Sequence, residues 1–303
     1  MSRQSPNHIM RLTNGVSEMK IAIKPNLTRE NAYTVTLSVF RELKSLGANI
    51  VFSNEFESEL SCLDAEFLPD DELYGDCDVM IAIGGDGTII HSAYKCAKHG
   101  KKILGINAGR LAFMAGIEEQ ELHLLKNLID GDYETDIRMM LMAELYENDR
   151  LVDTSYCIND VVIARGTAMR MCDISVKCDS KPVNDYYADG IIVSTPTGST
   201  AYALSAGGPV IDPTIESIGL TPICTHSLFS RSLIFKPTSV LEISVKNAEI
   251  GKPILSCDGC NSIELKEHNK IIIKKADVSA QFIRIKSDTF IDVLSQKLAQ
   301  RRA

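Results

Sequence analysis

Residues 79–90 read Val-Met-Ile-Ala-Ile-Gly-Gly-Asp-Gly-Thr-Ile-Ile, and this stretch decides the fold. The unbroken apolar run at its start predicts a strand buried on both faces, as in a parallel sheet. Gly84, Gly85 and Gly87 permit positive φ and leave backbone N–H groups open to a ligand. Thr88 is the predicted N-cap of a following helix, whose N-terminus would favour a bound phosphate.

Asp86 is the one side chain of this loop that can take part in chemistry. A carboxylate beside a phosphate repels it, unless the carboxylate holds Mg²⁺ or accepts a proton from an attacking hydroxyl. The loop therefore indicates phosphoryl transfer. A tight strand–helix turn that binds no ligand uses similar residues. Residues 84–87 alone do not distinguish these two interpretations.

Length and composition are those of an ordinary soluble globular protein. A chain of 303 residues predicts two domains, and 45% hydrophobic with 24% charged residues is typical of globular proteins. The net charge of −8 argues against nucleic acid or an anionic membrane as partner. The nine scattered cysteines, without a signal peptide, indicate reduced thiols in a cytoplasm. No apolar run approaches the ~20 residues that span a bilayer.

The first part of the chain alternates strands with helices. Residues 1–18 are polar and aperiodic, which predicts a disordered leader. Beside the 79–83 strand, we expect strands at 19–24, 50–52 and 102–107, a helix from an N-cap at Thr28 to Gly47, and a helix over 119–129 closed by Gly131. This alternation predicts an α/β, Rossmann-like domain over residues 19–135, with ligands at the carboxyl ends of its strands.

After residue 135 short alternating runs predict an all-β, sandwich-like domain over 136–285. The expected strands are 139–145, 152–158, 161–164, 174–178, 190–194, 232–235, 240–245, 263–265 and 271–274, with one short helix near 200–206. The tail predicts an amphipathic helix over 289–297 with Phe290, Val293 and Leu294 inward. We expect this last segment, 286–303, to return to the first domain, because a lone helix needs an apolar surface to cover.

Three further motifs are candidates for a binding site. Asn159-Asp160 precedes an apolar run and offers donors and acceptors for a ribose diol or an adenine edge, although an Asx-type turn is the simpler interpretation. Residues 188–202 carry consecutive small hydroxyl residues, which predict an uncharged polar pocket for a sugar or adenine, with Tyr202 placed to stack on a ring. Asp258-Gly259 is a turn signal that matters for function only if Asp258 approaches Asp86.

Together these residues resemble the NAD kinases from Met19 to the C-terminus. The resemblance rests on residues 84–88, 159–160, the long block 189–209, 221–224, His226-Ser227-Leu228 and 257–259. The glycine loop alone is shared with diacylglycerol-type lipid kinases and phosphofructokinases. The resemblance implies ATP-dependent phosphorylation of the adenosine-ribose 2′-hydroxyl of NAD to give NADP, with ATP or polyphosphate as donor.

The resemblance also implies roles for individual residues. Asp86 is the catalytic residue, acting on the 2′-hydroxyl. The implied binding residues are Gly84, Gly85, Gly87, Thr88, Phe113, Asn159, Asp160, Arg170, Asp189, Thr197, Thr200, Ala201, Tyr202, Ser205 and Asp258. The resemblance implies Mg²⁺ that arrives with the nucleotide and lies near Asp86, without a dedicated metal site. Family members assemble as homodimers or homotetramers, and the expected location is cytoplasmic. Ala112, Thr225 and Cys260 stand where the family usually has Gly, Pro and often Gln.

Two other function classes use some of the same features. A lipid kinase would share the glycine loop, but the block over 188–202 is polar and the chain lacks a basic amphipathic membrane face. A non-catalytic dinucleotide-sensing module would share the pocket residues without needing the carboxylate of Asp86. The chain has no Walker Gly-x-x-x-x-Gly-Lys sequence, so no P-loop lysine neutralises the donor phosphates.

Overall fold

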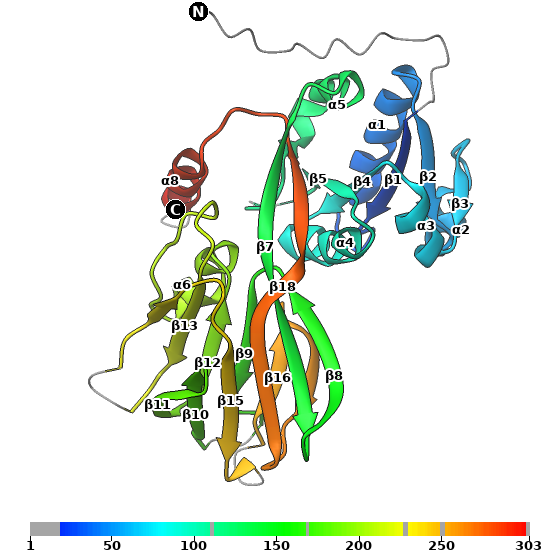
Figure 1. Ribbon diagram of the computed structural model, residues 1–303. Helices are drawn as coiled ribbons and strands as arrows, with labels where there is room; N and C mark the ends of the chain where they lie inside the picture. The colour runs from blue at the N-terminus through cyan, green and yellow to red at the C-terminus, as the bar shows by residue number, and fades with distance from the viewer. Residues whose placement is uncertain (1–18, 110–111, 168–169, 227–229, 249–251, 301–303) are drawn as a thin grey trace, which may run out of the picture.

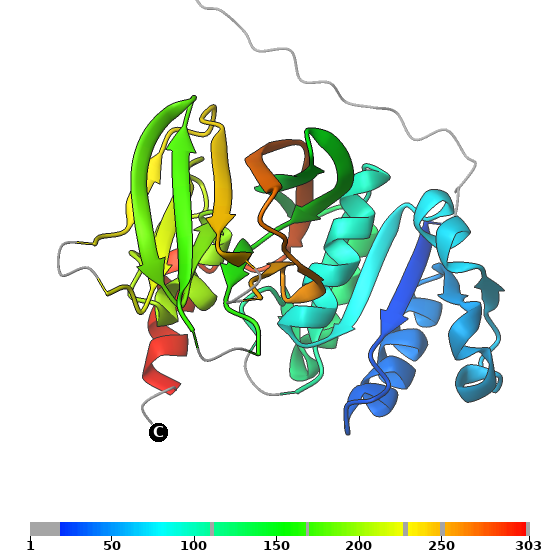
Figure 2. The same cartoon turned by 90° about the horizontal axis from the view of Figure 1, so that it is seen from below.

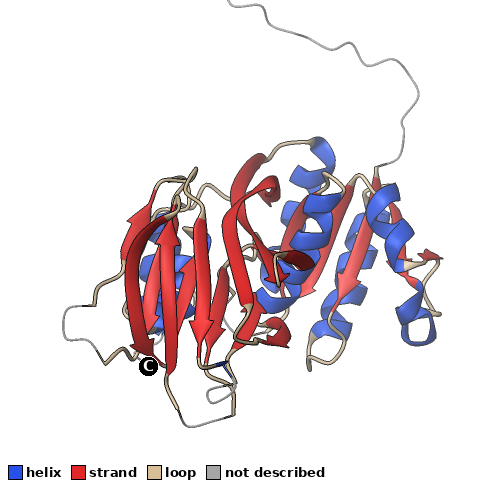
Figure 3. Cartoon of the chain, turned by 60° about the horizontal axis from the view of Figure 1, so that its bottom comes forward, coloured by secondary structure: helices blue, strands red, loops and turns tan. Residues whose placement is uncertain are grey.

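The computed structural model describes residues 19–109, 112–167, 170–226, 230–248 and 252–300. The predicted disordered leader, residues 1–18, lies outside the described residues. Figure 1 shows an α/β part joined to a part built mainly of strands, and Figure 3 shows that most helices belong to the α/β part. The chain therefore has the two-part organisation predicted from its sequence.

Five parallel strands form the sheet of the α/β part. In sheet order they are β3 (Glu66–Leu68), β2 (Asn49–Ser53), β1 (Lys20–Pro25), β4 (Val79–Gly84) and β5 (Lys102–Asn107). Every residue of β4 is buried, as its apolar run predicts. The connecting elements are α1 (Ala32–Ser45), η1 (Asn54–Phe56), α2 (Glu57–Leu60), α3 (Asp70–Asp76) and α4 (Asp86–Lys98).

Two predicted helix caps are wrong. The N-cap of α1 is Asn31, because the Thr28 hydroxyl instead donates to Asn26 Oδ1 at 2.6 Å and closes a local turn. The N-cap of α4 is Gly85, so Thr88 lies in the first helical turn, where its Oγ1 accepts from Asn26 Nδ2 at 3.0 Å.

The glycine loop does not use the positive φ that its three glycines permit. Two of them are needed for space instead. A Cβ on Gly84 would lie 2.6 Å from Thr88 Oγ1, and a Cβ on Gly85 would lie 2.9 Å from the guanidinium of Arg29.

The helix expected over 119–129 is divided in two. A short strand β6 (Ile117–Glu118) precedes η2 (Glu119–Leu124) and α5 (Leu125–Asp130), which Gly131 closes at φ +75° as predicted. The two pieces meet at Leu124 and Leu125, and inside η2 the backbone of Glu121 leaves helical geometry. Its carboxylate accepts from Glu118 N at 2.8 Å and pairs with Lys286 at 2.9 Å, which holds this turn in a capping box.

The β-rich part contains all the predicted strands and three more. They are β7 (Glu134–Glu147), β8 (Arg150–Cys157), β9 (Asp160–Ala164), β10 (Cys172–Cys178), β11 (Lys181–Ala188), β12 (Gly190–Ser194), β13 (Ile218–Ile223), β14 (Leu233–Phe235), β15 (Leu241–Lys246), β16 (Ile254–Cys257), β17 (Cys260–Glu264) and β18 (Asn269–Arg284). The short helix appears as η3 (Thr197–Thr200) and α6 (Tyr202–Ser205). One sheet has the order β14-β13-β12-β9-β16-β17, and apolar residues from it and from the larger sheet share one core.

Strand β18 joins the two parts. It runs antiparallel to β7 and β15, and its end then pairs in parallel with β5 through Gln281–Lys102 and Phe282–Ile103. The return to the first part is thus made by a strand that covers the edge of β5. Figures 1 and 2 place the final helix, α8 (Phe290–Gln300), on the side of the β-rich part near α6. The expectation that this helix packs on the α/β part is therefore wrong, and residues 301–303 lie outside the described residues.

Within the described residues, no helix is long and apolar enough to cross a membrane. All nine cysteines are free thiols, four of them buried.

Candidate functional site

Asp86 is the first residue of α4, directly after the buried strand β4. It is half-buried, and its Oδ1 accepts a hydrogen bond from the backbone N–H of Met114 at 2.8 Å. No described residue donates to its second oxygen, which is therefore available to a ligand. The position at a helix N-terminus also favours a negative charge there.

Arg29 is a functional candidate that sequence reasoning missed. Its guanidinium lies 2.9 Å from where a Cβ on Gly85 would be, and 3.2 Å from the corresponding point at Gly109. Glycine at these two positions, after β4 and β5, therefore makes room for a cation beside the loop. The available signal was the position of Arg29 shortly after the end of β1, because parallel sheets bind ligands beyond the carboxyl ends of their strands.

Asn159-Asp160, called the second motif below, is held in place by Asp258, which lies about a hundred residues further along the chain. Its carboxylate accepts from the backbone N–H groups of Ile158 at 2.7 Å, Asn159 at 2.8 Å and Asp160 at 3.1 Å. Asp258 N donates back to the carbonyl of Asp160 at 3.0 Å. The structure thus brings Asp258 to the second motif and occupies both its oxygens there. Its direct contact with a dinucleotide remains a prediction.

The side chains of Asn159 and Asp160 keep their hydrogen-bonding capacity. Among the described residues, none forms a hydrogen bond with either side chain. Asp160 is only 5% exposed, and burial, followed by the nearby charge of Asp258, raises the pKa of its carboxyl to about 7. A buried acceptor without a donor fits a ligand hydroxyl better than it fits a closed turn.

The hydroxyl-rich segment packs directly against this motif. Thr195 N donates to the Asn159 carbonyl at 2.8 Å, and Thr195 Oγ1 donates to the Ile158 carbonyl at 2.5 Å. A Cβ on Gly198 would fall 2.0 Å from the Asn159 oxygen, so only glycine allows this approach. The Ser199 hydroxyl is also used internally, on the Pro196 carbonyl at 2.6 Å. Several of the hydroxyls thus build the site, whereas the sequence had suggested that they face a ligand.

The remaining binding candidates of this segment differ in access. Thr197 is buried and accepts from Arg138 at 3.2 Å, and the Thr200 hydroxyl donates to the Thr197 carbonyl at 3.1 Å. Ala201 is half-buried, whereas Tyr202 is 46% exposed and Ser205 is exposed. Tyr202 and Ser205 therefore remain accessible to a ligand.

An apolar cluster holds the glycine loop and the second motif in one fixed arrangement. Ile89 and Ile90 of α4 belong to the same cluster as Ile158, which directly precedes Asn159. Tyr94 of α4 also stacks on Tyr156 of β8, with ring centroids 6.2 Å apart. Because cores are close-packed, α4 and the second motif cannot shift independently.

Among the described residues, Arg170 and Asp189 take part in none of the contacts given above. Arg170 is exposed and lines a separate cavity of about 150 Å³ with Tyr187 and Lys246. Asp189 forms an ion pair with Arg165 at 2.9 Å. Phe113 is half-buried beside Met114, and Ser227 and Leu228 of the family motif lie outside the described residues.

Comparisons with known proteins show which family this chain resembles along most of its length. The family described as the ATP-NAD kinase N-terminal domain matches residues 19–133, and the ATP-NAD kinase C-terminal domain matches residues 158–285. The NAD kinase of Caldanaerobacter subterraneus is 38% identical over 93% of this chain and 99% of its own. That of Acetivibrio thermocellus is 32% identical over 93% and 98%.

Two solved structures share the fold. A yeast NADH kinase complexed with NADH superposes with a TM-score of 0.86 at 21% identity, covering 93% of this chain and 88% of its own. An NAD kinase from Archaeoglobus fulgidus in complex with ATP gives a TM-score of 0.67 at 23% identity, covering 92% and 99%. These matches define a two-part kinase fold with an α/β N-terminal and a β-rich C-terminal half.

The chain belongs to the NAD kinase family. This confirms the resemblance inferred from the motifs, and the matches favour neither a lipid kinase nor a sensing module.

The raised pKa of Asp160 predicts a pH-dependent stability difference. An unfolded Asp ionises near pH 3.9, whereas folded Asp160 ionises at about pH 7, so the folded state binds the proton more tightly. The contribution of Asp160 to the stability of the wild type should therefore fall as pH rises from about 4 to about 7. Asp160→Asn removes this loss and should stabilise the protein by about 2–4 kcal/mol more at pH 8 than at pH 4.

Urea unfolding of wild type and Asp160→Asn at pH 4 and pH 8 measures this difference. Asp277→Asn is the control, because Asp277 is an exposed carboxylate on β18. An equal effect of Asp160→Asn at both pH values would contradict the prediction.

Proposed function

We propose that the chain transfers the γ-phosphoryl group of ATP to the adenosine-ribose 2′-hydroxyl of NAD, giving NADP and ADP. The observation that supports this most directly is Asp86, whose free oxygen lies at the N-terminus of α4 in a glycine loop. The chain's membership of the NAD kinase family supports the same reaction.

Asp86 is the proposed catalytic residue. A bond forms between the 2′-oxygen and the γ-phosphorus, the bond to the β–γ bridging oxygen breaks, and ADP leaves. The hydroxyl barely ionises at neutral pH, so its proton needs an acceptor as the bond forms, and the free oxygen of Asp86 can accept it. The hydrogen bond from Met114 holds the carboxylate in place for that step.

The described residues fit a divalent metal that arrives with the nucleotide. They contain no cluster of three or more His, Cys, Asp or Glu side chains arranged to hold an ion, whereas Mg²⁺ commonly takes one carboxylate plus phosphate oxygens. Asp86 would supply that carboxylate. When bound, Mg²⁺ would neutralise charge on the donor phosphates.

The acceptor dinucleotide would occupy the surface around the second motif. Asn159 and Asp160 offer an amide and a carboxyl without partners among the described residues, and Tyr202 offers an accessible ring. We propose Thr200, Ala201 and Ser205 as further contributors to this acceptor site, and the glycine-loop residues Gly84, Gly85, Gly87 and Thr88 as contributors to the binding of the donor phosphates.

A coupled assay tests the function. Purified protein with ATP, Mg²⁺ and NAD should form NADP, detected by an NADP-specific dehydrogenase. Separate reactions with polyphosphate as donor and NADH as acceptor define substrate range. Absence of NADP under all these conditions would refute the proposal.

Asn159→Ala tests the acceptor site. Because the Asn159 side chain has no partner among the described residues, its removal should leave the fold intact. Loss of its hydrogen bonds to NAD, each worth about 0.5–1.5 kcal/mol, should raise the KM for NAD by roughly three- to tenfold. Steady-state kinetics measures this, and an unchanged KM in a folded variant would assign Asn159 a structural role only.

We also propose finer descriptions of the fold and assembly. The strand order of the α/β part supports a Rossmann-like domain over 19–135, and the shared core of two sheets supports a sandwich-like domain over 136–285. We propose a cytoplasmic homodimer or homotetramer. Light scattering should show a dimer or larger at micromolar concentration, and a fully active monomer would contradict the assembly.

A further inference from the structure

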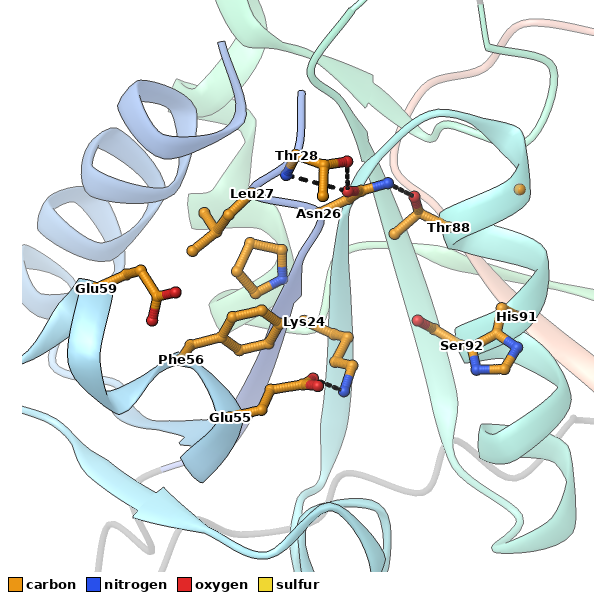
Figure 4. A pocket seen from close by; sticks show the side chains of 12 residues that line it. Lys24, Asn26, Leu27, Thr28, Glu55, Phe56, Glu59, Thr88, His91 and Ser92 are labelled. Atoms are coloured by element: carbon orange, nitrogen blue, oxygen red, sulfur yellow. Dashed lines mark hydrogen bonds and ion pairs between the residues drawn. The ribbon is translucent and has the colours of Figure 1, made fainter. Parts of the chain in front are cut away.

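A cavity of about 630 Å³ lies beside the glycine loop and is not used by the acceptor site described above. Figure 4 shows its lining side chains, which come from the end of β1, from η1 and α2, and from the first turns of α4. Gly87 and Thr88 form one wall. The cavity therefore opens directly beside Asp86, from the side of β1.

The lining of this cavity carries more negative than positive charge, and its lysine is already paired. Lys24 Nζ pairs with Asp70 at 2.6 Å and also with Glu55. Glu59 adds a further carboxylate to the lining. Burial, followed by repulsion from Lys95 and Lys24, lowers the pKa of His91, so its ring is neutral at pH 7. Such a lining disfavours phosphates.

The same lining suits an uncharged nucleoside. Phe56 and Leu27 supply apolar surface, and the Glu55 and Glu59 carboxylates can accept from ribose hydroxyls or an exocyclic amine. The volume is in the range of small-molecule sites.

Arg29 supplies the positive charge that the cavity lacks. Its guanidinium lies against Gly85 and Gly109, and it forms no ion pair with any residue that the structure describes. The bond from Asn26 Nδ2 to Thr88 Oγ1 ties the loop that carries Arg29 to the first turn of α4. An exposed cation is thereby held over the start of α4, where phosphates are favoured.

We propose that the phosphate donor binds from the β1 side, with its nucleoside in this cavity and its phosphates against Arg29. The proposal rests on the kinase function above and adds the donor site to it. Arg29 then performs the neutralising role that a P-loop lysine has in other kinases. Donor and acceptor reach Asp86 from different sides of α4.

The first experiment changes the charge. Arg29→Ala should raise the KM for ATP by about 10- to 100-fold, and should weaken competitive inhibition by inorganic tripolyphosphate similarly. The KM for NAD should change by less than about twofold, and Arg29→Lys should recover part of the loss. Arg41→Ala, at an exposed arginine on the following helix α1, is the matched control. If Arg29→Ala left both the KM for ATP and the inhibition constant of tripolyphosphate unchanged, the proposed role of Arg29 would be overturned.

The second experiment fills the cavity. Leu27→Trp should raise the KM for ATP by about tenfold or more and leave tripolyphosphate inhibition unchanged, because tripolyphosphate has no nucleoside. Equal effects on both compounds, or on neither, would overturn the nucleoside assignment. If the wild type forms no NADP, the proposed function fails separately, and calorimetric binding of ADP to the same variants decides the donor site.

Discussion

Asp258→Ala should destabilise the protein by about 2–4 kcal/mol and raise the KM for NAD. The substitution removes the acceptor of three backbone N–H groups at 158–160, and each buried unpaired donor costs about 1–3 kcal/mol. Part of this cost is offset, because burial raises the pKa of Asp258 and the wild type therefore carries a costly buried carboxylate. The KM should rise because Asn159 and Asp160 lose their support.

Urea unfolding and NAD kinetics measure the two effects of Asp258→Ala, with Asp277→Ala as an exposed control on β18. Asp258→Asn separates positioning from stability, since Asn keeps one acceptor and tolerates the φ of +50° at this position. It also removes the charge that raises the pKa of Asp160, so Asp160 should titrate below pH 7 in this variant. An unchanged KM for NAD in a destabilised Asp258→Ala would limit Asp258 to folding.

Elements with strong local patterns were predictable from the sequence. Strands β4, β5 and β12 carry continuous apolar runs, and their predicted limits agree with the structure to within a residue. The short elements over residues 54–76 were missed because they are acidic and lack a regular apolar period. Strand β13 was missed because Gly219 and Pro222 interrupt its apolar pattern.

The tertiary roles of site residues were harder to predict. Asp258 and Asn159 are 99 residues apart, and neither local sequence records that one binds the backbone of the other. The role of Arg29 was equally hard to predict, because it depends on Gly85 and Gly109, two glycines in distant loops that leave room for its guanidinium. The sequence showed which residues could take part in catalysis or binding. The residues that hold them in place could be identified only from the folded structure.

Asp86→Asn should reduce kcat by at least roughly 10²-fold while leaving the fold intact. Asn Oδ1 can still accept from Met114 N, so the loop keeps its hydrogen bond. The lost charge at the helix N-terminus should cost only about 0.3–1 kcal/mol of unfolding free energy. The variant lacks the carboxylate that accepts the 2′-hydroxyl proton or holds Mg²⁺, and general-base assistance alone contributes about 10²–10⁴-fold. Asp64→Asn, an exposed aspartate away from the loop, is the control.

A Mg²⁺ titration of Asp86→Asn separates the two roles of the carboxylate. If Asp86 acts only as the base, residual activity should saturate at the same Mg²⁺ concentration as in the wild type. If Asp86 holds the metal, saturation should require much more Mg²⁺, because one of its few protein ligands is weakened. NAD should bind the variant as well as it binds the wild type, since the acceptor contacts at Asn159 and Asp160 are untouched. A near-normal kcat with ATP and NAD would show that Asp86 is not catalytic and would refute the mechanism proposed for this chain.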